Sequence, residues 1–164
     1  LQTTAEYTSF KLVVEWRWAP GAAARLGKTP NSGVLLHTSG SDRVWPLCVE
    51  AQLMHTNAGD FWLLSQSTLK VGGEGKGPGA YVNVKKREPA SEKPVGEWNH
   101  YEITVRGDTV TVVLNGKTVL PGAKIPDLPP RGRIALQHHG GKQNGQWNSP
   151  PSLLQFKNIY VKEI

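Results

Sequence analysis

Residues 45–64, WPLCVEAQLMHTNAGDFWLL, hold two short extended runs on either side of a turn. Apolar side chains stand at every second position from 47 to 53, and the side chains of a β-strand alternate between its two faces. This run therefore predicts a strand with one face in a core. On its other face stand Glu50 and Gln52, about 6.5–7 Å apart at about 3.3 Å of rise per residue. That separation suits a carboxylate and a carboxamide that hold one sugar-sized ligand between them.

Further polar and aromatic residues surround the turn after this strand. His55 precedes the turn at 57–59, and Asp60 and Trp62 follow it. Side chains of these kinds around one hairpin are more typical of a site than of scaffold. Plainer interpretations stay open, with His55 in a structural or exposed role and Asp60 as a cap that accepts backbone hydrogen bonds within its own turn.

The six tryptophans divide by their surroundings. Three stand in or beside regular alternating runs and are predicted to lie in the core: Trp16, Trp18 and Trp98. The C–H faces of a sugar ring suit an aromatic surface. The other three tryptophans stand near loops and are candidates for such stacking: Trp45, Trp62 and Trp147.

Composition limits the class of protein. One domain is expected from 164 residues, since compact domains cluster at about 100–150 residues. The chain contains Gly 18 and Pro 12, which suits many short strands joined by tight turns. Its net charge of +6 comes from scattered Lys and Arg with one run at 85–87, which disfavours nucleic-acid binding. No apolar stretch reaches the length of a membrane span, and the single cysteine, Cys48, excludes an internal disulfide.

Alternating apolar positions predict strands along most of the chain. The clearest lie at 9–18, 34–38, 61–66, 81–87, 134–139 and 153–164, with a three-stranded meander after residue 98 that turns at Gly107-Asp108 and Asn115-Gly116. A loop is predicted at 19–30, in preference to a short Ala-rich helix, and another at 140–151; the Gly-rich residues 71–80 are expected to form a mobile loop beside a cleft. Roughly nine to eleven strands, joined by hairpins and long crossovers, favour an all-β fold, a two-sheet antiparallel β-sandwich of jelly-roll type.

Seven segments, in this order, carry a resemblance to a known family: YTSFKLVVEWRW, NSGVLLH, VEAQLMHTNAGDFW, GEWNHYEITVRGD, VLNGK, GRIALQHHG and FKNIYV. Together they resemble the 3-keto-disaccharide hydrolase family of bacterial proteins over nearly the whole chain. The resemblance implies a fold like the concanavalin A-like lectins and glucanases, a carbohydrate ligand, and a place in the bacterial periplasm, at the cell surface or outside the cell. Members usually carry one or two further strands before the position of Tyr7, so an N-terminal part of the family's fold is expected to be missing here.

The resemblance also suggests a reaction. Glucanases of similar fold carry a Glu-x-Asp-x-x-Glu pattern, where this chain has Glu50, Gln52 and His55. One of the two carboxylates that ordinary glycoside hydrolysis needs is therefore absent from the pattern. A 3-keto sugar needs a single base, because the ketone acidifies the hydrogen on C2 and the C1 leaving group then departs by elimination, with water adding afterwards. Glu50 is the candidate base, and His139 or His55 the candidate acid.

Other residues complete the candidate site. The candidate substrate-binding residues are Gln52, Asp60, Trp62, Trp45 and Gln137. His37, Glu50 and His139 would make a divalent-metal site if they converged. Such a metal, His37 itself, or Lys and Arg from loops would stabilise the enolate. The family commonly has arginine at the position of His37, and aspartate, serine or alanine at His138; His139 is preferred over His138 because it fits the family's His-Gly.

Two classes of function stay open from the sequence. The first is an enzyme acting on oxidised or ordinary glycosides, with Glu50 deep in a cleft, a perturbed pKa, and a histidine within hydrogen-bond reach. The second is a non-catalytic carbohydrate-binding module, with Glu50 on an open face ringed by tryptophans. A structural or protein-interaction domain, in which Glu50 and Gln52 are a polar pair on a solvent-facing strand, is the plainest alternative.

Overall fold

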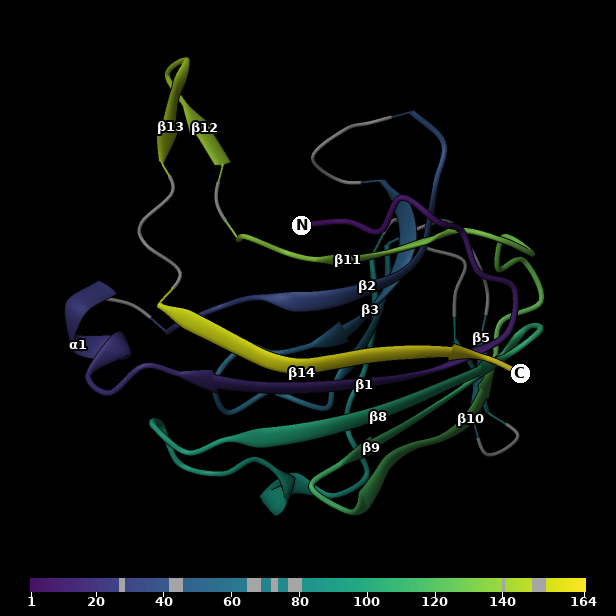
Figure 1. The fold of residues 1–164 in the computed structure, drawn as a ribbon, viewed down its shortest axis with the longest axis horizontal. Coiled ribbons are helices and arrows are strands. Elements are labelled where there is room, and N and C mark those ends of the chain that lie inside the picture. Colours follow the sequence, from purple (N-terminus) through teal and green to yellow (C-terminus); the bar gives the residue numbers. More distant parts are fainter. Residues whose placement is uncertain are drawn as a thin grey trace.

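The computed structural model describes residues 1–26, 29–41, 46–64, 69–71, 74–76, 81–139, 141–148 and 153–164. Nearly all of its regular elements are strands, and these form two antiparallel sheets packed face to face (Figure 1). The predicted all-β jelly-roll sandwich is confirmed. No helix among the described residues is long and apolar enough to cross a membrane.

The larger of the two sheets contains seven described strands. Its order is β14 (Leu154–Glu163), β1 (Phe10–Trp18), β8 (Asn99–Arg106), β9 (Thr109–Leu114), β10 (Lys117–Lys124), β5 (Leu69–Val71) and β6 (Glu74–Lys76). The β9–β10 turn is the predicted Asn115-Gly116, where φ is 51° and 79°. Positive φ at both central residues is what a tight hairpin of this kind requires.

The smaller sheet contains five described strands and carries the residues of interest. Its order is β11 (Arg133–Leu136), β2 (Gly33–Ser39), β3 (Leu47–Gln52), β4 (Phe61–Leu64) and β7 (Val82–Val84). The strand predicted in residues 45–64 is β3, and it lies in the middle of this sheet, with two strands on each side. A separate hairpin, β12 (Gly141–Gln143) and β13 (Gln146–Asn148), stands away from both sheets (Figure 1).

Several predicted loops contain regular structure. The predicted loop 19–30 includes a helix, α1 (Ala22–Leu26), so the Ala-rich alternative was the right one. The predicted loop 140–151 contains the β12–β13 hairpin. Outside these two segments, a 3-10 turn occupies Pro89–Ser91. Of the expected mobile loop at 71–80, residues 72–73 and 77–80 lie outside the described residues.

One hydrophobic core fills the space between the two sheets. Its largest fully buried side chains come from both layers: Trp16, Trp18, Tyr101, Phe10, Phe61, Leu12, Leu36, Leu53, Leu63, Ile103 and Leu114. Two of the aromatic residues also hold the end of β3. The Tyr101 hydroxyl donates to the Gln52 carbonyl at 2.6 Å, and Trp18 Nε1 donates to the Leu53 carbonyl at 3.1 Å. Side chains of the larger sheet therefore hold the end of β3 in place through hydrogen bonds from the core side.

Trp98 is an exception to the predicted core. It is only half-buried and lies against two cations, with Arg17 Cζ at 4.7 Å and Lys157 Nζ at 4.2 Å from its ring centroid. Cations are attracted to the face of an aromatic ring. The prediction of a core position for Trp98 is therefore wrong, whereas the predictions for Trp16 and Trp18 are confirmed.

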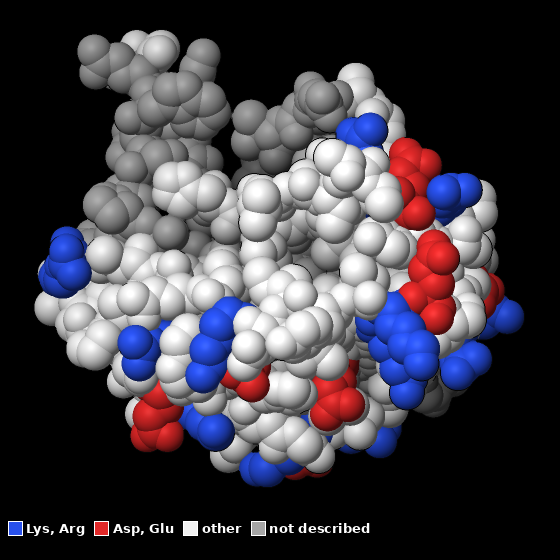
Figure 2. All heavy atoms as spheres, in the orientation of Figure 1, with Lys and Arg blue, Asp and Glu red and all other residues white. Residues whose placement is uncertain are grey.

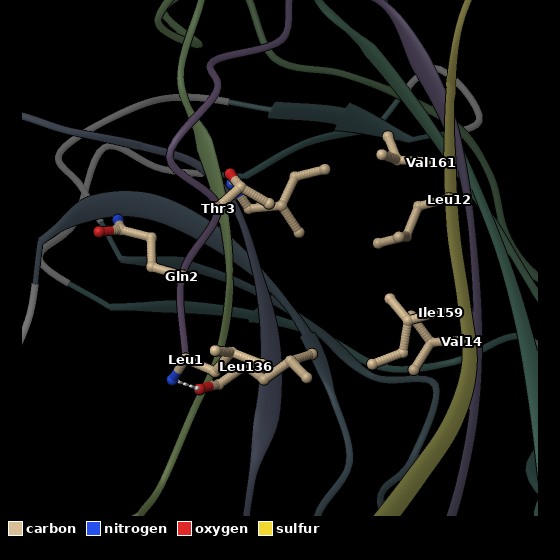
Figure 3. A pocket seen from close by; sticks show the side chains of 9 residues that line it. Leu1, Gln2, Thr3, Leu12, Val14, Leu136, Ile159 and Val161 are labelled. Atoms are coloured by element: carbon tan, nitrogen blue, oxygen red, sulfur yellow. Dashed lines mark hydrogen bonds between the residues drawn. The ribbon is translucent and has the colours of Figure 1, made fainter.

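The N-terminal residues run beside β11. Backbone hydrogen bonds join Thr3 to Ile134 and Tyr7 to Gly132. Between this segment and β14 lies an apolar groove of about 310 Å³, in which Leu12, Ile159 and Val161 face Leu136 (Figure 3). On the face shown in Figure 2, acidic and basic side chains are interspersed around an uncharged central band.

Candidate functional site

Glu50 lies on the face of the smaller sheet that points away from the core. Its strand neighbours Val49 and Ala51 are core residues, so alternation places Glu50 on the opposite face. In the sheet register Glu50 pairs with Trp62 on β4, and Trp62 pairs with Asn83 on β7. A carboxyl, an indole and a carboxamide thus stand in one row across three strands.

The Glu50 side chain is buried although it lies outside the core. It is 4% exposed, and this burial raises the pKa of its carboxyl to about 7. Removal from water disfavours the charged form of a carboxyl, so the neutral and charged forms are close in free energy near neutral pH. Glu50 is therefore able to take up and release a proton under physiological conditions.

Cys48 lies two residues before Glu50 on the same face and is almost fully buried. Burial, with a smaller contribution from the Glu50 charge, raises the pKa of its thiol to about 12. The thiolate is the nucleophilic form of cysteine. Cys48 is therefore unsuited to nucleophilic catalysis in this structure.

The Glu50 side chain leans over β2 at Gly33. A Cβ atom at Gly33 would overlap Glu50 Cγ, Cδ and Oε1. Gly33 thus leaves the space that the carboxyl occupies, and the carboxyl points away from β4 and toward β11. Gly33 could not be identified from the sequence, because a glycine at the start of a strand pattern carries no sign of which side chain lies above it.

Gln52 and Asp60, both predicted to bind substrate, take part in local structure. Gln52 Oε1 accepts hydrogen bonds from the backbone N–H groups of Leu53 and Met54 at 3.0 and 2.9 Å. Asp60 accepts from Lys85 Nζ at 2.8 Å and from the Lys86 N–H at 3.1 Å. These contacts shape the turn after β3 and join β4 to the residues after β7. Since Glu50 leans the other way, Asp60 is not turned toward it as the partner of a two-carboxylate mechanism.

His37 does not lie on the Glu50 face. Its φ of 53° interrupts the alternation of β2, and the register with β3 shifts between Leu36 and Ser39. The ring is fully buried, stacks on Phe10 at 5.8 Å and contacts the Pro129 carbonyl through Nδ1. Burial lowers the pKa of His37, so it is neutral at pH 7. The predicted roles of His37 as metal ligand and enolate stabiliser are therefore wrong.

The predicted metal site is not formed. Among the described residues, no group of three His, Cys, Asp or Glu side chains could hold a metal ion. His37, Glu50 and His139 are all described, and they do not converge. His139 is half-buried and follows β11, three residues after its last residue.

The remaining predicted residues are placed as follows. His55 Nδ1 lies 3.0 Å from Glu92 Oε1, so one ring nitrogen of this candidate acid is already committed. Trp62 is half-buried and pairs with Glu50 in the sheet register, and its stacking on a sugar stays a prediction. Trp45 and the side chain of Trp147 lie outside the described residues.

Two side-chain amides on the same face have buried atoms with unmet hydrogen-bonding capacity. Among the described side chains, Gln137 Oε1 and Asn83 Nδ2 are buried and have no hydrogen-bond partner. Gln137 follows β11 beside Gly33, whose carbonyl accepts from the Gln137 N–H at 2.9 Å. Gln137 was predicted as a substrate-binding residue, whereas Asn83 was missed because a single asparagine in a short strand gives no signal.

The chain matches one protein family over almost its whole length. Residues 1–162 match the family described as the 3-keto-alpha-glucoside-1,2-lyase-like domain. The chain belongs to this family. The family resemblance of the seven segments is thereby confirmed. No curated protein sequence matches this chain.

Solved structures support the fold of this 3-keto-alpha-glucoside-1,2-lyase-like domain. Two proteins of Parabacteroides distasonis, both provisionally named glycosyl hydrolases, are 22% and 18% identical, with TM-scores of 0.62 and 0.63. Each aligns with 99% of this chain, which covers 82% and 75% of theirs. The carbohydrate-binding module CBM66 of Bacillus subtilis is 11% identical with a TM-score of 0.59, over 98% of this chain and 78% of its own. At these identities the likeness shows the fold alone.

Proposed function

We propose that this domain binds a glycoside over the Glu50 face and cleaves its glycosidic bond when the sugar carries a 3-keto group. The observation that carries the proposal is the buried Glu50 carboxyl, with a pKa of about 7, in the middle strand of the smaller sheet. A general base works best with a pKa near the operating pH. Membership of a family named for a 3-keto-alpha-glucoside lyase activity supports the substrate class.

The proposed reaction needs one base and one acid. The Glu50 carboxylate takes the proton from C2, and the electron pair of that C–H bond forms the enolate of the 3-keto group. The enolate then expels the C1 substituent, whose oxygen leaves with the C1–O electron pair and receives a proton from an acid. Water adds afterwards to the C1–C2 double bond if the product is a free sugar. The candidate acids are His139 and His55, and Nδ1 of His55 lies 3.0 Å from Glu92 Oε1.

The contacts of Trp62 fit this proposal. The Trp62 indole stands directly opposite Glu50 and offers an apolar surface for a sugar ring. Burial of a ligand between these residues would exclude water and strengthen each polar contact in the site. Export into the bacterial periplasm, to the surface or out of the cell stays a prediction from the family resemblance.

The test is to incubate the protein with a 3-keto-α-glucoside in deuterated water and to follow cleavage and C2 labelling. We expect the cleavage rate to rise with pH through about 7, as Glu50 loses its proton, and deuterium to enter C2. Glu50→Gln should lower the rate by at least 10²-fold, whereas Glu102→Gln, an exposed glutamate on the other sheet, serves as the control. Full activity in Glu50→Gln would remove Glu50 as base, and cleavage without label would remove the elimination.

Binding without cleavage is the alternative outcome of the same experiment. Asp60 is held by Lys85 while Glu50 leans over Gly33, so these two carboxylates do not form a catalytic pair, which suits a binding site as well as a one-base enzyme. If glycosides bind and neither keto nor parent forms are cleaved, the domain is a carbohydrate-binding module.

A further inference from the structure

The Glu50 face carries one amide on each side of the carboxyl. Asn83 is on β7, two strands from β3 in one direction, and Gln137 follows β11, two strands away in the other direction. At about 4.8 Å between neighbouring strands, each amide lies about 10 Å from the line of β3. The two amides therefore lie on opposite sides of the β3 backbone, each about two strand spacings away.

Both amides point to the Glu50 face of the sheet. Val82 and Val84 pack on the core, so Asn83 between them points the other way. Ile134 and Leu136 also pack on the core side, which places the alternate position Gln137 on the Glu50 face. In the described part of the protein, the buried atoms Asn83 Nδ2 and Gln137 Oε1 lack partners. A buried polar atom left unpaired costs about 1–3 kcal/mol, which a ligand group or a water would relieve.

The Glu50 side chain leans toward β2, so the side of the site toward β11 differs from the side toward β7. Its carboxyl lies over Gly33, and the Gly33 carbonyl accepts the hydrogen bond of the Gln137 N–H. The Ser32 hydroxyl also donates to the Gln137 carbonyl at 2.6 Å, which fixes the backbone of Gln137. The carboxyl and the Gln137 amide thus belong to one side of the site, and Trp62 with Asn83 to the other.

We propose that the ligand lies across the strands, with Gln137 contacting the ring beside the Glu50 carboxyl and Asn83 contacting the second unit beyond Trp62. This inference rests on the proposed function and makes both amides specificity-determining residues. The ligand groups that suit them are hydroxyls, because a hydroxyl donates to an amide oxygen and accepts from an amide nitrogen. Gly33 is the positioning residue that allows the carboxyl to lie on the Gln137 side.

The binding test compares a one-ring probe with a two-ring probe. Methyl α-D-glucopyranoside and maltose, each in parent and 3-keto form, are titrated calorimetrically into the Glu50→Gln protein, in which cleavage of the 3-keto probes is expected to be slow. In that background Gln137→Leu should weaken binding of both probes about tenfold, the effect of losing about 1.4 kcal/mol. Asn83→Leu should weaken only the two-ring probe. Gln155→Leu, an exposed amide on β14, should change neither.

Failure of this inference can be distinguished from failure of the proposed function. If the wild type and the Glu50→Gln protein bind none of the probes, the proposed function fails and this inference with it. If the probes bind but Asn83→Leu weakens the one-ring and the two-ring probe equally, or neither substitution weakens either probe, only the orientation across the strands is overturned.

Two measurements need no ligand. Since the unpaired amide atoms stabilise nothing in the free protein, Gln137→Leu and Asn83→Leu should leave the thermal midpoint unchanged or raise it, and a clear fall would make the amides structural. In a double-mutant cycle, Gly33→Ala should lower the midpoint much less in the Glu50→Ala background than in the wild type, because the overlapping atoms are then absent. An equal fall in both backgrounds would contradict the placement of the carboxyl over Gly33.

Discussion

Glu50 links the chemistry of the site to the stability of the protein. Its pKa is raised from 4.5 to about 7 in the folded state. A raised pKa means that folding favours the protonated carboxyl, so the contribution of Glu50 to stability is full below pH 4.5 and is lost as pH rises through 7. The cost of keeping a charged carboxyl buried is about 3 kcal/mol at higher pH, at about 1.4 kcal/mol per pKa unit.

The first prediction compares Glu50→Gln with the wild type in urea unfolding from pH 4.5 to pH 8. We expect the difference in the free energy of unfolding to move in favour of Glu50→Gln by about 3 kcal/mol over this range. Glu163→Gln, an exposed glutamate on β14, should show no such trend. A difference that stays constant with pH would mean that Glu50 titrates normally in the folded protein.

At the scale of single residues, alternation predicted the face of Glu50 correctly but not the contacts of the residues around it. Strict alternation in residues 47–53 placed Glu50 away from the core. Alternation could not show that His37 turns inward, because the left-handed φ at that position breaks the period of the strand. Nor could it show that the hydrogen-bonding groups of Gln52 and Asp60 are used by nearby backbone and by Lys85.

At the scale of elements, the β9–β10 hairpin depends on Asn115. Its Nδ2 donates to the Ser91 carbonyl and to Asn99 Oδ1, both at 2.8 Å, and its Oδ1 accepts from the His100 N–H at 2.9 Å. Its φ of 51° is one that asparagine tolerates better than most residues. The same side chain therefore shapes the turn and ties it to the 3-10 segment.

The second prediction is that Asn115→Ala lowers the free energy of unfolding by about 2 kcal/mol, through backbone strain and lost hydrogen bonds. Asn115→Gly should lower the free energy of unfolding by less, because glycine adopts this φ without strain. The hydrogen bonds of the Asn115 side chain are lost in both variants. Chemical denaturation measures both. An Asn115→Gly protein less stable than Asn115→Ala would contradict the role of φ at this turn.

Elements with a strong period were predicted well and short ones were not. The run at 9–18 became β1, and the Asn115-Gly116 turn lies where the sequence placed it. Helix α1 was taken for a loop because five residues carry too little periodicity to outweigh the flanking Pro and Gly. Trp98 was assigned to the core because the sequence does not show that Arg17 and Lys157 flank its ring.

At the scale of the whole molecule, both sheets share one core. Buried residues of β1, β8 and β9 on one side and of β2, β3 and β4 on the other form a single cluster. Neither sheet can keep its apolar face from water without the other. A domain built in this way should unfold as one cooperative unit.

The third prediction is therefore a single unfolding transition for residues 1–164, as expected of one domain. Tryptophan fluorescence, which reports on the buried Trp16 and Trp18, and far-ultraviolet circular dichroism should give the same midpoint in urea. The control variant Glu102→Gln should also give the same urea midpoint by both methods. Two separated midpoints would show that the sheets lose their structure independently.

Cys48 gives the molecule a built-in chemical reporter. It is the single thiol of the chain, lies on the Glu50 face and is 1% exposed, so alkylating reagents reach it only when β3 opens. The labelling rate of Cys48 thus measures how often β3 opens, and the measurement needs no dye or tag. A sugar that binds over Glu50 should slow that rate in proportion to its occupancy, and this would allow a ligand to be recognised before any reaction is known.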